Sequence, residues 1–227
     1  MSREELLAWV GIFIGIPSFL LLFFTGQVII GIFVALIVGG LIWFRWSLNQ
    51  PEFTLLRIEK TLTFHDPKAE RATFMRRQAA RANHKGLTEF WIRSISADGS
   101  IENIQIDGKA PDIMGVEAGD IAICKRFREP LERGAVDEMT VTYDIVNAFN
   151  GHMESTIHVV AYKTRYVRIA VETHKDRPIK SARAVLRYGG QKYKKLPQPK
   201  LSSNNCRAEM EVKRPKLGAE YYLEWDW

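Results

Sequence analysis

Two apolar segments near the start of the chain place the strongest constraint on what it can fold into. No charged side chain occurs from Leu6 to Phe24 or from Val28 to Phe44. As helices with a rise of about 1.5 Å per residue, they span roughly 29 and 26 Å, close to the roughly 30 Å hydrocarbon core of a bilayer. The sequence therefore predicts two transmembrane helices. Only residues 25–27 separate them, so we expect an antiparallel hairpin over residues 1–46.

The charges around this hairpin predict its orientation. Arg3 precedes the first segment and Arg45 follows the second, while the turn carries no charge. By the positive-inside rule, both termini and everything after the hairpin are expected in the cytoplasm. A cleaved signal peptide is the alternative for the first segment, but Glu4 and Glu5 and a second apolar segment do not fit one. A buried globular hairpin is a further alternative, and the apolar circumference of both helices argues against it.

Small residues recur at every fourth position in both segments. They are Gly11 and Gly15 in the first, and Gly31, Ala35 and Gly39 in the second. Such stripes allow helix backbones to approach closely in lipid. They predict helix packing, either within one hairpin or between the hairpins of an oligomer.

The rest of the chain has the pattern of an all-β domain. After a short linker at residues 47–52, apolar and polar side chains alternate at 139–145 and at 221–227. Alternation of this kind indicates half-buried antiparallel strands. Further strand-like runs occur at 54–64, 119–127, 164–172 and 206–212. With about ten expected strands, residues 53–227 predict an antiparallel β-sandwich or a partly closed β-barrel.

Three glycine-containing pairs suggest hairpin turns between these strands, because glycine tolerates positive φ. They are Asp98-Gly99, Asn150-Gly151 and Gly189-Gly190. The Ala- and Arg-rich stretch at 69–82 is ambiguous, and its place between two strand-like runs favours a strand or a short helix.

The chain shows no pattern typical of an enzyme, a metal site or a cofactor site. Cys124 and Cys206 are widely spaced, and the histidines have no zinc-site spacing. The pair His65-Asp66 could form a general base with an orienting carboxylate, but neighbours in a strand point to opposite faces. A turn residue before Pro67 is the favoured interpretation of His65. We therefore expect a non-enzyme without cofactor or metal.

The positive charge of the chain is concentrated in one region. The formal net charge is +6, and residues 180–216 carry eleven Lys or Arg against two Glu. Around the expected turn at Gly189-Gly190, strand alternation gathers candidate ligand-binding residues: Arg183, Arg187, Tyr188, Lys192 and Lys194. Such a surface suits a phosphate-bearing ligand or an anionic lipid headgroup. A solvated basic face is the alternative.

A second basic run lies earlier in the chain and supplies further candidates. Arg76 and Arg81 belong to it, and Trp91 and Arg93 follow. A solvated basic face held near an anionic membrane is again the alternative to a specific pocket. We count these four among the candidate ligand-binding residues.

The order of segments resembles a known family. The stretch MSREELLAWVGIFIGIPSFLLLFFTGQVIIGIFVALIVGG, a very short linker and a β-rich domain together resemble the two-transmembrane β-rich effectors of bacterial antiphage (CBASS-like) signalling systems. The resemblance implies an inner-membrane protein whose β domain senses a cyclic oligonucleotide. It also implies that the helices assemble as a homo-oligomer that disrupts the bilayer.

Two functions are therefore expected from the sequence. The first is a membrane-disrupting antiphage effector that senses a cyclic oligonucleotide. The second is a membrane-tethered module that docks a protein partner, with the hairpin as a passive anchor. Specific binding of duplex DNA or RNA is not expected.

Overall fold

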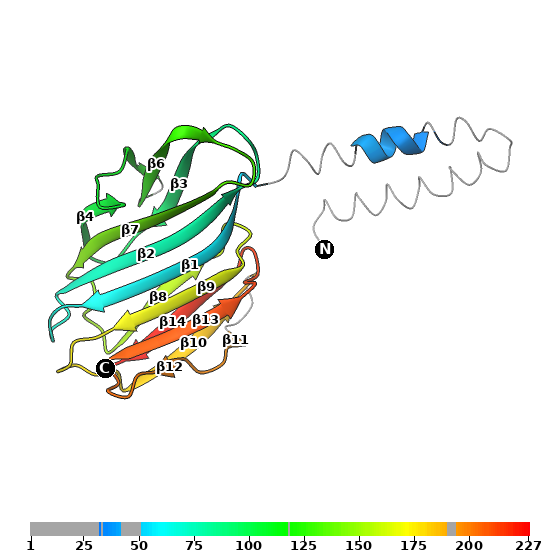
Figure 1. The fold of residues 1–227 in the computed structure, drawn as a ribbon. Coiled ribbons are helices and arrows are strands. Elements are labelled where there is room, and N and C mark those ends of the chain that lie inside the picture. Colours follow the sequence, from blue (N-terminus) through cyan, green and yellow to red (C-terminus); the bar gives the residue numbers. More distant parts are fainter. Residues whose placement is uncertain (1–31, 33, 42–50, 118, 190–193) are drawn as a thin grey trace. The chain divides into compact units, whose positions relative to one another are not determined.

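The computed structural model describes residues 32, 34–41, 51–117, 119–189 and 194–227. They belong to two separate units, residues 1–50 and Pro51–Trp227. In the first unit the described residues, 32 and 34–41, are helical and exposed. In the second unit they form β-strands, turns and loops (Figure 1).

The helix corrects the prediction of a membrane hairpin. The described helical residues, 32 and 34–41, cover only about 14 Å, less than half of a bilayer core. No helix among the described residues has the length and apolar character that a membrane crossing requires. The predicted two-helix hairpin, and with it the assignment to the inner membrane, is therefore wrong for this structure. The rest of both apolar segments, including Gly11, Gly15 and Gly31, lies outside the described residues.

The two described members of the small-residue stripe show no close packing. Ala35 and Gly39 are both exposed. A Cβ added at Gly39 would meet no atom within 4 Å among the described residues. The helix packing expected at these two positions is not observed.

The second unit contains fourteen strands among its described residues, arranged in three sheets. The seven-stranded sheet has the order β12 (Lys200–Leu201), β13 (Arg207–Lys213), β9 (Tyr166–Glu172), β1 (Phe53–Phe64), β2 (Arg71–Ala82), β7 (Val136–Val146) and β4 (Ser100–Ile106). The four-stranded sheet has the order β11 (Lys194–Lys195), β10 (Ser181–Arg187), β14 (Glu220–Asp226) and β8 (Met153–Val159). The three-stranded sheet has the order β3 (Leu87–Ile95), β6 (Asp120–Leu131) and β5 (Ile113–Glu117).

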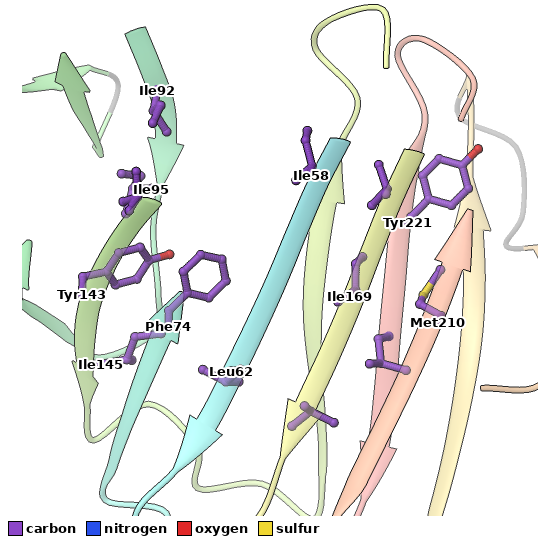
Figure 2. Close-up of a cluster of buried hydrophobic side chains, with 14 of the residues drawn as sticks. Ile58, Leu62, Phe74, Ile92, Ile95, Tyr143, Ile145, Ile169, Met210 and Tyr221 are labelled. Carbon is purple, nitrogen blue, oxygen red and sulfur yellow. The ribbon is translucent and has the colours of Figure 1, made fainter. Parts of the chain in front are cut away.

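The seven-stranded sheet packs one face against both smaller sheets, so this unit is a β-sandwich. The ring of Phe53 at the start of β1 lies 4.8 Å from that of Phe90 in β3. The ring of Phe64 at the end of β1 lies 6.1 Å from that of Trp225 in β14. One continuous cluster of buried side chains connects the layers, and Figure 2 shows part of it. An all-β domain is therefore confirmed.

Strand alternation explains which side chains face this core. In β7, Met139, Val141, Tyr143 and Ile145 are buried, while the residues between them are half-buried and face outward. The same period of two holds in β14, where Trp225 is 1% exposed. The ambiguous stretch at 69–82 forms strand β2 from Arg71 onward, because its even-numbered residues also face the core.

Two of the three expected hairpins are wrong. The chain passes Asp98-Gly99 from β3 to β4 and Asn150-Gly151 from β7 to β8, and in each case these strands belong to different sheets. Gly99 is needed for a different reason: a Cβ there would lie 2.1 Å from the carbonyl oxygen of Val146. The third expectation holds in part, since β10 and β11 pair antiparallel over two residues of each strand, while residues 190–193 between them lie outside the described part of the chain.

The turn interpretation of His65-Asp66 is confirmed. The carboxylate of Asp66 accepts hydrogen bonds from the backbone N–H groups of Lys68, Glu70 and Arg71. It thereby closes the loop that joins β1 to β2. These bonds hold the pKa of Asp66 below its usual value, although burial opposes them.

Candidate functional site

A cavity of about 860 Å³ lies between the layers of the sandwich. Its floor is the inner face of β1, β2 and β7. Its walls come from β3 and β8, which are outermost in the two smaller sheets and have no further strand neighbour among the described residues. The cavity therefore occupies the place where the second layer is interrupted.

The wall formed by β3 is irregular next to the cavity. The pairing of β3 with β6 shifts register between Ile92 and Ile95, and Ser94 has a φ of 58°. Bulges of this kind bend a strand edge and often lie beside functional sites. Here the bend lies where the chain leaves the sheet to line the cavity.

Two cations lie side by side on the floor. Lys60 of β1 is paired in register with Arg76 of β2. Both occupy positions at which the strands otherwise place apolar groups toward the core: Ile58 and Leu62 flank Lys60, and each is at most 2% exposed. Both cations are half-buried, and both belong to the lining of the cavity.

Lys60 has no acidic partner among the described residues. Its Nζ donates a hydrogen bond of 2.9 Å to the carbonyl oxygen of Ile157, at the free edge of β8. It also lies 5.7 Å from the centre of the Phe74 ring. Burial, and then the charge of Arg76, lowers the pKa of Lys60 to about 7. Near neutral pH this amine is therefore only partly protonated.

Arg76 is also without an ion pair in the described part of the chain. Its Nε is buried and has no hydrogen-bond partner there. Burial lowers the pKa of Arg76 to about 10, and the neighbouring Tyr143 and Tyr162 act in the opposite direction. The guanidinium thus stays charged at neutral pH. Burial raises the pKa of Tyr143 above its usual value, so this phenol stays neutral beside it.

A third basic group completes the cluster from the opposite wall. His158 of β8 is 4% exposed, and its Nε2 has no hydrogen-bond partner among the described residues. Burial, followed by the charges of Lys60 and Arg76, lowers the pKa of His158 to about 2. The imidazole is therefore neutral, and its unpaired nitrogen can give or take a hydrogen bond according to its tautomer.

The carboxylates that line the cavity do not neutralise this cluster. Asp98 and Glu154 are the acidic residues of the lining. Glu154 accepts a hydrogen bond of 2.6 Å from the backbone N–H of Gly151, and burial raises its pKa. Neither carboxylate forms a salt bridge with Lys60 or Arg76. The site consequently presents uncompensated positive charge to the interior of the cavity.

The structure separates the candidate ligand-binding residues of the second basic run. Arg76 lies on the cavity floor, and Trp91 and Arg93 belong to the lining. However, Trp91 and Arg93 alternate with buried Phe90 and Ile92, so their side chains point away from the core. The Nε1 of Trp91 donates to Glu89 over 2.8 Å, and Arg93 lies 3.5 Å from Glu117.

The fourth candidate of this run lies elsewhere. Arg81, near the end of β2, pairs in register with Thr54 and Val136 and does not line the cavity. It is on the opposite face of β2 from Arg76, because the two residues are five positions apart and successive side chains of a strand alternate between its faces.

The candidates around the β10–β11 turn do not gather into one open basic surface. Arg183 forms an ion pair with Glu224, and Arg187 lies 3.8 Å from Glu220, both on β14. The ring of Tyr188 is 3.5 Å from the ammonium group of Lys216. Lys194 is exposed on β11, and Lys192 lies outside the described residues. The negative side chains of β14 thus compensate the arginines of β10.

Sequence reasoning missed Lys60 and His158 as members of a site. A signal for Lys60 was present, because in TLLRIEKTLTF it falls in the same alternation phase as Ile58 and Leu62. A charged residue in the apolar phase of a strand is either paired in the core or faces a cavity. His158 could not be assigned in this way, because the residues around it in β8 alternate weakly.

The comparisons with known proteins leave the function open. No protein-family model and no functionally described protein matches the sequence. The crystal structure of an M1 zinc metallopeptidase from Deinococcus radiodurans is 10% identical, with a TM-score of 0.43 over 76% of this chain and 42% of that chain. Native yeast LTA4 hydrolase is 9% identical, with a TM-score of 0.44 over 76% of this chain and 29% of that chain. This chain thus spans less than half of either protein, and a likeness of this degree supports no statement about activity.

Proposed function

We propose that the β domain is a binding module that senses a small organic anion, in particular a phosphate-bearing one, in the cavity between β3 and β8. The observation that carries the proposal is the pair Lys60 and Arg76, adjacent on the cavity floor without any acidic partner in the described part of the chain.

The free energy of burying charge supports this proposal. An unpaired charge removed from water costs several kcal/mol, so buried cations in folded proteins are normally paired. Two cations facing one cavity lack that compensation when the cavity is empty. A phosphate or carboxylate would supply the missing charge, and its oxygens would accept hydrogen bonds from both groups and from a suitable tautomer of His158.

The size and walls of the cavity suit a ligand that also has an apolar or aromatic part. A volume of about 860 Å³ lies within the range of roughly 300–1,000 Å³ that is typical of small-molecule sites. The rings of Phe74 and Tyr143 stack on one another at 4.7 Å on the floor, beside the cations. A nucleotide combines both features, as the resemblance to the antiphage effectors implies.

The proposal covers only ligand sensing by the β domain and does not include membrane disruption. A cyclic oligonucleotide as the ligand, a role in antiphage defence, and assembly into a homo-oligomer stay predictions from the sequence. The alternative, docking of a protein partner, also stays a prediction and is separated from ligand binding by the experiment below.

Calorimetry on the full chain tests the proposal. The probes are inorganic phosphate, pyrophosphate, a mononucleotide and a panel of cyclic oligonucleotides. We expect at least one of them to bind to the wild type. Arg76→Gln should weaken that binding by roughly tenfold to a hundredfold, because hydrogen bonds to charged groups contribute about 1.5–3 kcal/mol.

Arg81→Gln is the matched control. It removes the same charge from the same strand but outside the cavity, so its affinity should equal that of the wild type. Equal weakening by both substitutions would mean that net charge, not the cavity, binds the anion. If no probe binds to the wild type, the proposal fails and a protein-docking role is favoured.

A further inference from the structure

We propose that Lys60 is a reactive amine that forms an imine with organic anions carrying an aldehyde or keto group. This inference rests on the proposed function, because it requires that the cavity admit an organic anion. It adds a covalent step and a more specific ligand class: a carbonyl compound whose carboxylate or phosphate lies beside Arg76.

The first support is the environment of the amine. Lys60 faces the cavity, contacts a neutral carbonyl oxygen and an aromatic ring, and forms no ion pair among the described residues. Desolvation and a neighbouring cation are the conditions that keep a lysine amine neutral and therefore nucleophilic. The lowered pKa of Lys60, about 7, agrees with this environment.

Lys125 shows the opposite arrangement in the same domain. Its Nζ lies 3.0 Å from Asp107 and 2.9 Å from Asp137. Hydrogen bonds to these carboxylates raise the pKa of Lys125 despite its partial burial. This lysine is held in the protonated form and is not nucleophilic. The contrast indicates that the missing acidic partner, not burial alone, distinguishes Lys60.

The second support is the pair of groups beside Lys60. Arg76 is its register neighbour on β2 and stays charged, so it can hold the anionic group of a ligand while the carbonyl carbon faces the amine. His158, whose pKa responds to both cations, has a neutral ring with an unpaired buried nitrogen. That nitrogen can form a hydrogen bond with the carbonyl oxygen of the ligand or with the hydroxyl group of the carbinolamine.

The reaction balances without any further reagent. The lone pair of neutral Lys60 Nζ forms a bond to the carbonyl carbon, and the carbonyl oxygen takes up a proton to give a carbinolamine. Loss of the remaining proton from nitrogen and departure of the hydroxyl group as water then give the imine. One water leaves for each imine formed, and no atom is oxidised or reduced. The step is reversible, so hydride reduction is needed to trap it.

The test uses the full chain with two anionic probes, glyoxylate and pyridoxal 5′-phosphate, in the presence of a borohydride reductant. Digestion and mass spectrometry locate the reduced adduct. We expect an adduct on Lys60 at pH 7 that forms roughly tenfold or more faster than on exposed lysines, because the side chain of an ordinary lysine is almost wholly protonated there. Preference for one probe distinguishes a carboxylate ligand from a phosphate ligand. A label spread evenly over exposed lysines overturns the proposal.

Two variants and an uncharged probe sharpen the result. Lys60→Arg should lose the adduct, while Lys194→Arg, which changes an exposed lysine on β11, should keep it. Arg76→Gln should slow trapping of glyoxylate about tenfold or more and slow trapping of uncharged propionaldehyde much less, because removing the Arg76 charge costs propionaldehyde only the part of the lowered Lys60 pKa that Arg76 causes. If propionaldehyde and glyoxylate react equally in the wild type, Arg76 does not hold the anion and the proposed ligand class is wrong.

The pH profile separates this inference from the proposed function. Trapping at Lys60 needs the neutral amine, so its rate should rise as pH increases through about 7. Binding of inorganic phosphate gains from the protonated amine, so its affinity should fall over the same range. If the protein binds phosphate but no adduct is trapped on Lys60, only the proposal of imine formation is overturned. If charged and uncharged aldehydes are trapped on Lys60 at the same rate, only the proposal of an anion-binding site is overturned. A trapping profile centred near pH 10 identifies an ordinary lysine and also overturns the imine proposal.

Discussion

At the scale of single residues, Lys60 and Arg76 stand out because stability alone does not account for them. Each occupies a core-facing position in a strand whose other core-facing residues are mostly apolar. Residues that lower stability in this way are commonly kept for function. Replacing either cation by an apolar group of similar size should therefore raise the stability of the fold and weaken the binding of an anion.

We expect Lys60→Met to stabilise the free protein by about 1 kcal/mol at pH 7, because it removes a half-buried, partly protonated amine that has no counter-ion among the described residues. The pKa of Lys60 is lower in the folded chain, about 7, than its ordinary value of 10.5. Between these values the unfolded chain binds more protons, so this cost is present below pH 7 and is relieved as pH rises toward 10. Urea unfolding at pH 7 and pH 9 measures both effects, and the gain should shrink at pH 9.

Lys125→Met is the control for this substitution. It leaves Asp107 and Asp137 without their shared cation, so it should destabilise the protein by about 1–3 kcal/mol. Destabilisation by Lys60→Met at both pH values would contradict this account. It would mean that the hydrogen bond from Lys60 to the carbonyl oxygen of Ile157 stabilises the fold by more than the charge of Lys60 destabilises it.

At the scale of elements, one carboxylate connects three strands of the large sheet. Asp144 of β7 accepts hydrogen bonds from Asn103 of β4 and from Arg71 and Thr73 of β2. These bonds lower the pKa of Asp144 to about 2, although burial opposes them. The cluster fixes the edge strand β4 to the rest of the sheet.

Asp144→Asn should therefore destabilise the domain at neutral pH by about 1 kcal/mol, a modest value because solvent screens the exposed Arg71. The folded-state pKa lies below the ordinary value of 3.8, so the stabilisation is present above pH 4 and is lost as pH falls toward 2. Thermal unfolding from pH 2 to pH 7 should show wild type and variant converging at the acidic end. Parallel curves over the whole range would contradict this account.

Gly99→Ala tests the close approach of β4 to the end of β7. An added Cβ would lie 2.1 Å from the carbonyl oxygen of Val146 and 2.9 Å from the backbone nitrogen of Ala148. Backbone atoms cannot move aside at little cost, so we expect a loss of about 2–4 kcal/mol in urea unfolding. Gly115→Ala in β5 is the control, since its Cβ would meet nothing within 4 Å. Equal stability of both variants would refute the steric argument.

Strands could be predicted from the sequence, but their partners could not. Alternation located β7 and β14 because each has one core face, which is a local property. The glycine pairs at 98–99 and 150–151 were misread as hairpins because a turn dipeptide does not show whether the next strand returns to the same sheet. No local sequence pattern in β1 or β9 indicates that these two strands pair in parallel. The cavity depends on those pairings, so it could not be predicted from the sequence. Only Lys60, a charged residue at a core-facing position of its strand, gave a local signal for it.

The predicted hairpin failed for a related reason. Length and lack of charge were the observations behind it, and both are necessary for a membrane helix. Neither specifies that a helix of that length forms. The described helical residues, 32 and 34–41, cover only part of the second segment.

At the scale of the whole molecule, the sandwich is organised around β1 and its two neighbours. β1 lies between β9 and β2 in the seven-stranded sheet, and its inner face contacts both smaller sheets. β5 and β12 lie at sheet edges and are largely exposed. Stability should therefore be uneven across the domain.

Native-state hydrogen exchange on the full chain measures this distribution. We expect the amides of β1 and β9 to exchange only with global unfolding, since their hydrogen bonds lie in the centre of the sheet. Amides of β5 and β12 should exchange by local opening, orders of magnitude faster. Faster exchange in β1 than in β5 would contradict this order.

The parallel pair of β1 and β9 also has a consequence for how the protein is made. Ile58 has Val167 as its neighbour, about 110 residues later in the chain. At about 5–20 residues per second, a ribosome needs roughly 5 to 20 seconds to supply that neighbour. During this interval the backbone groups along one edge of β1 have no strand partner, and the apolar residues of TLLRIEKTLTF lie next to that edge. The newly made chain is therefore expected to depend on chaperones until β9 emerges, and a translational pause before Tyr166 should lower its yield of soluble protein.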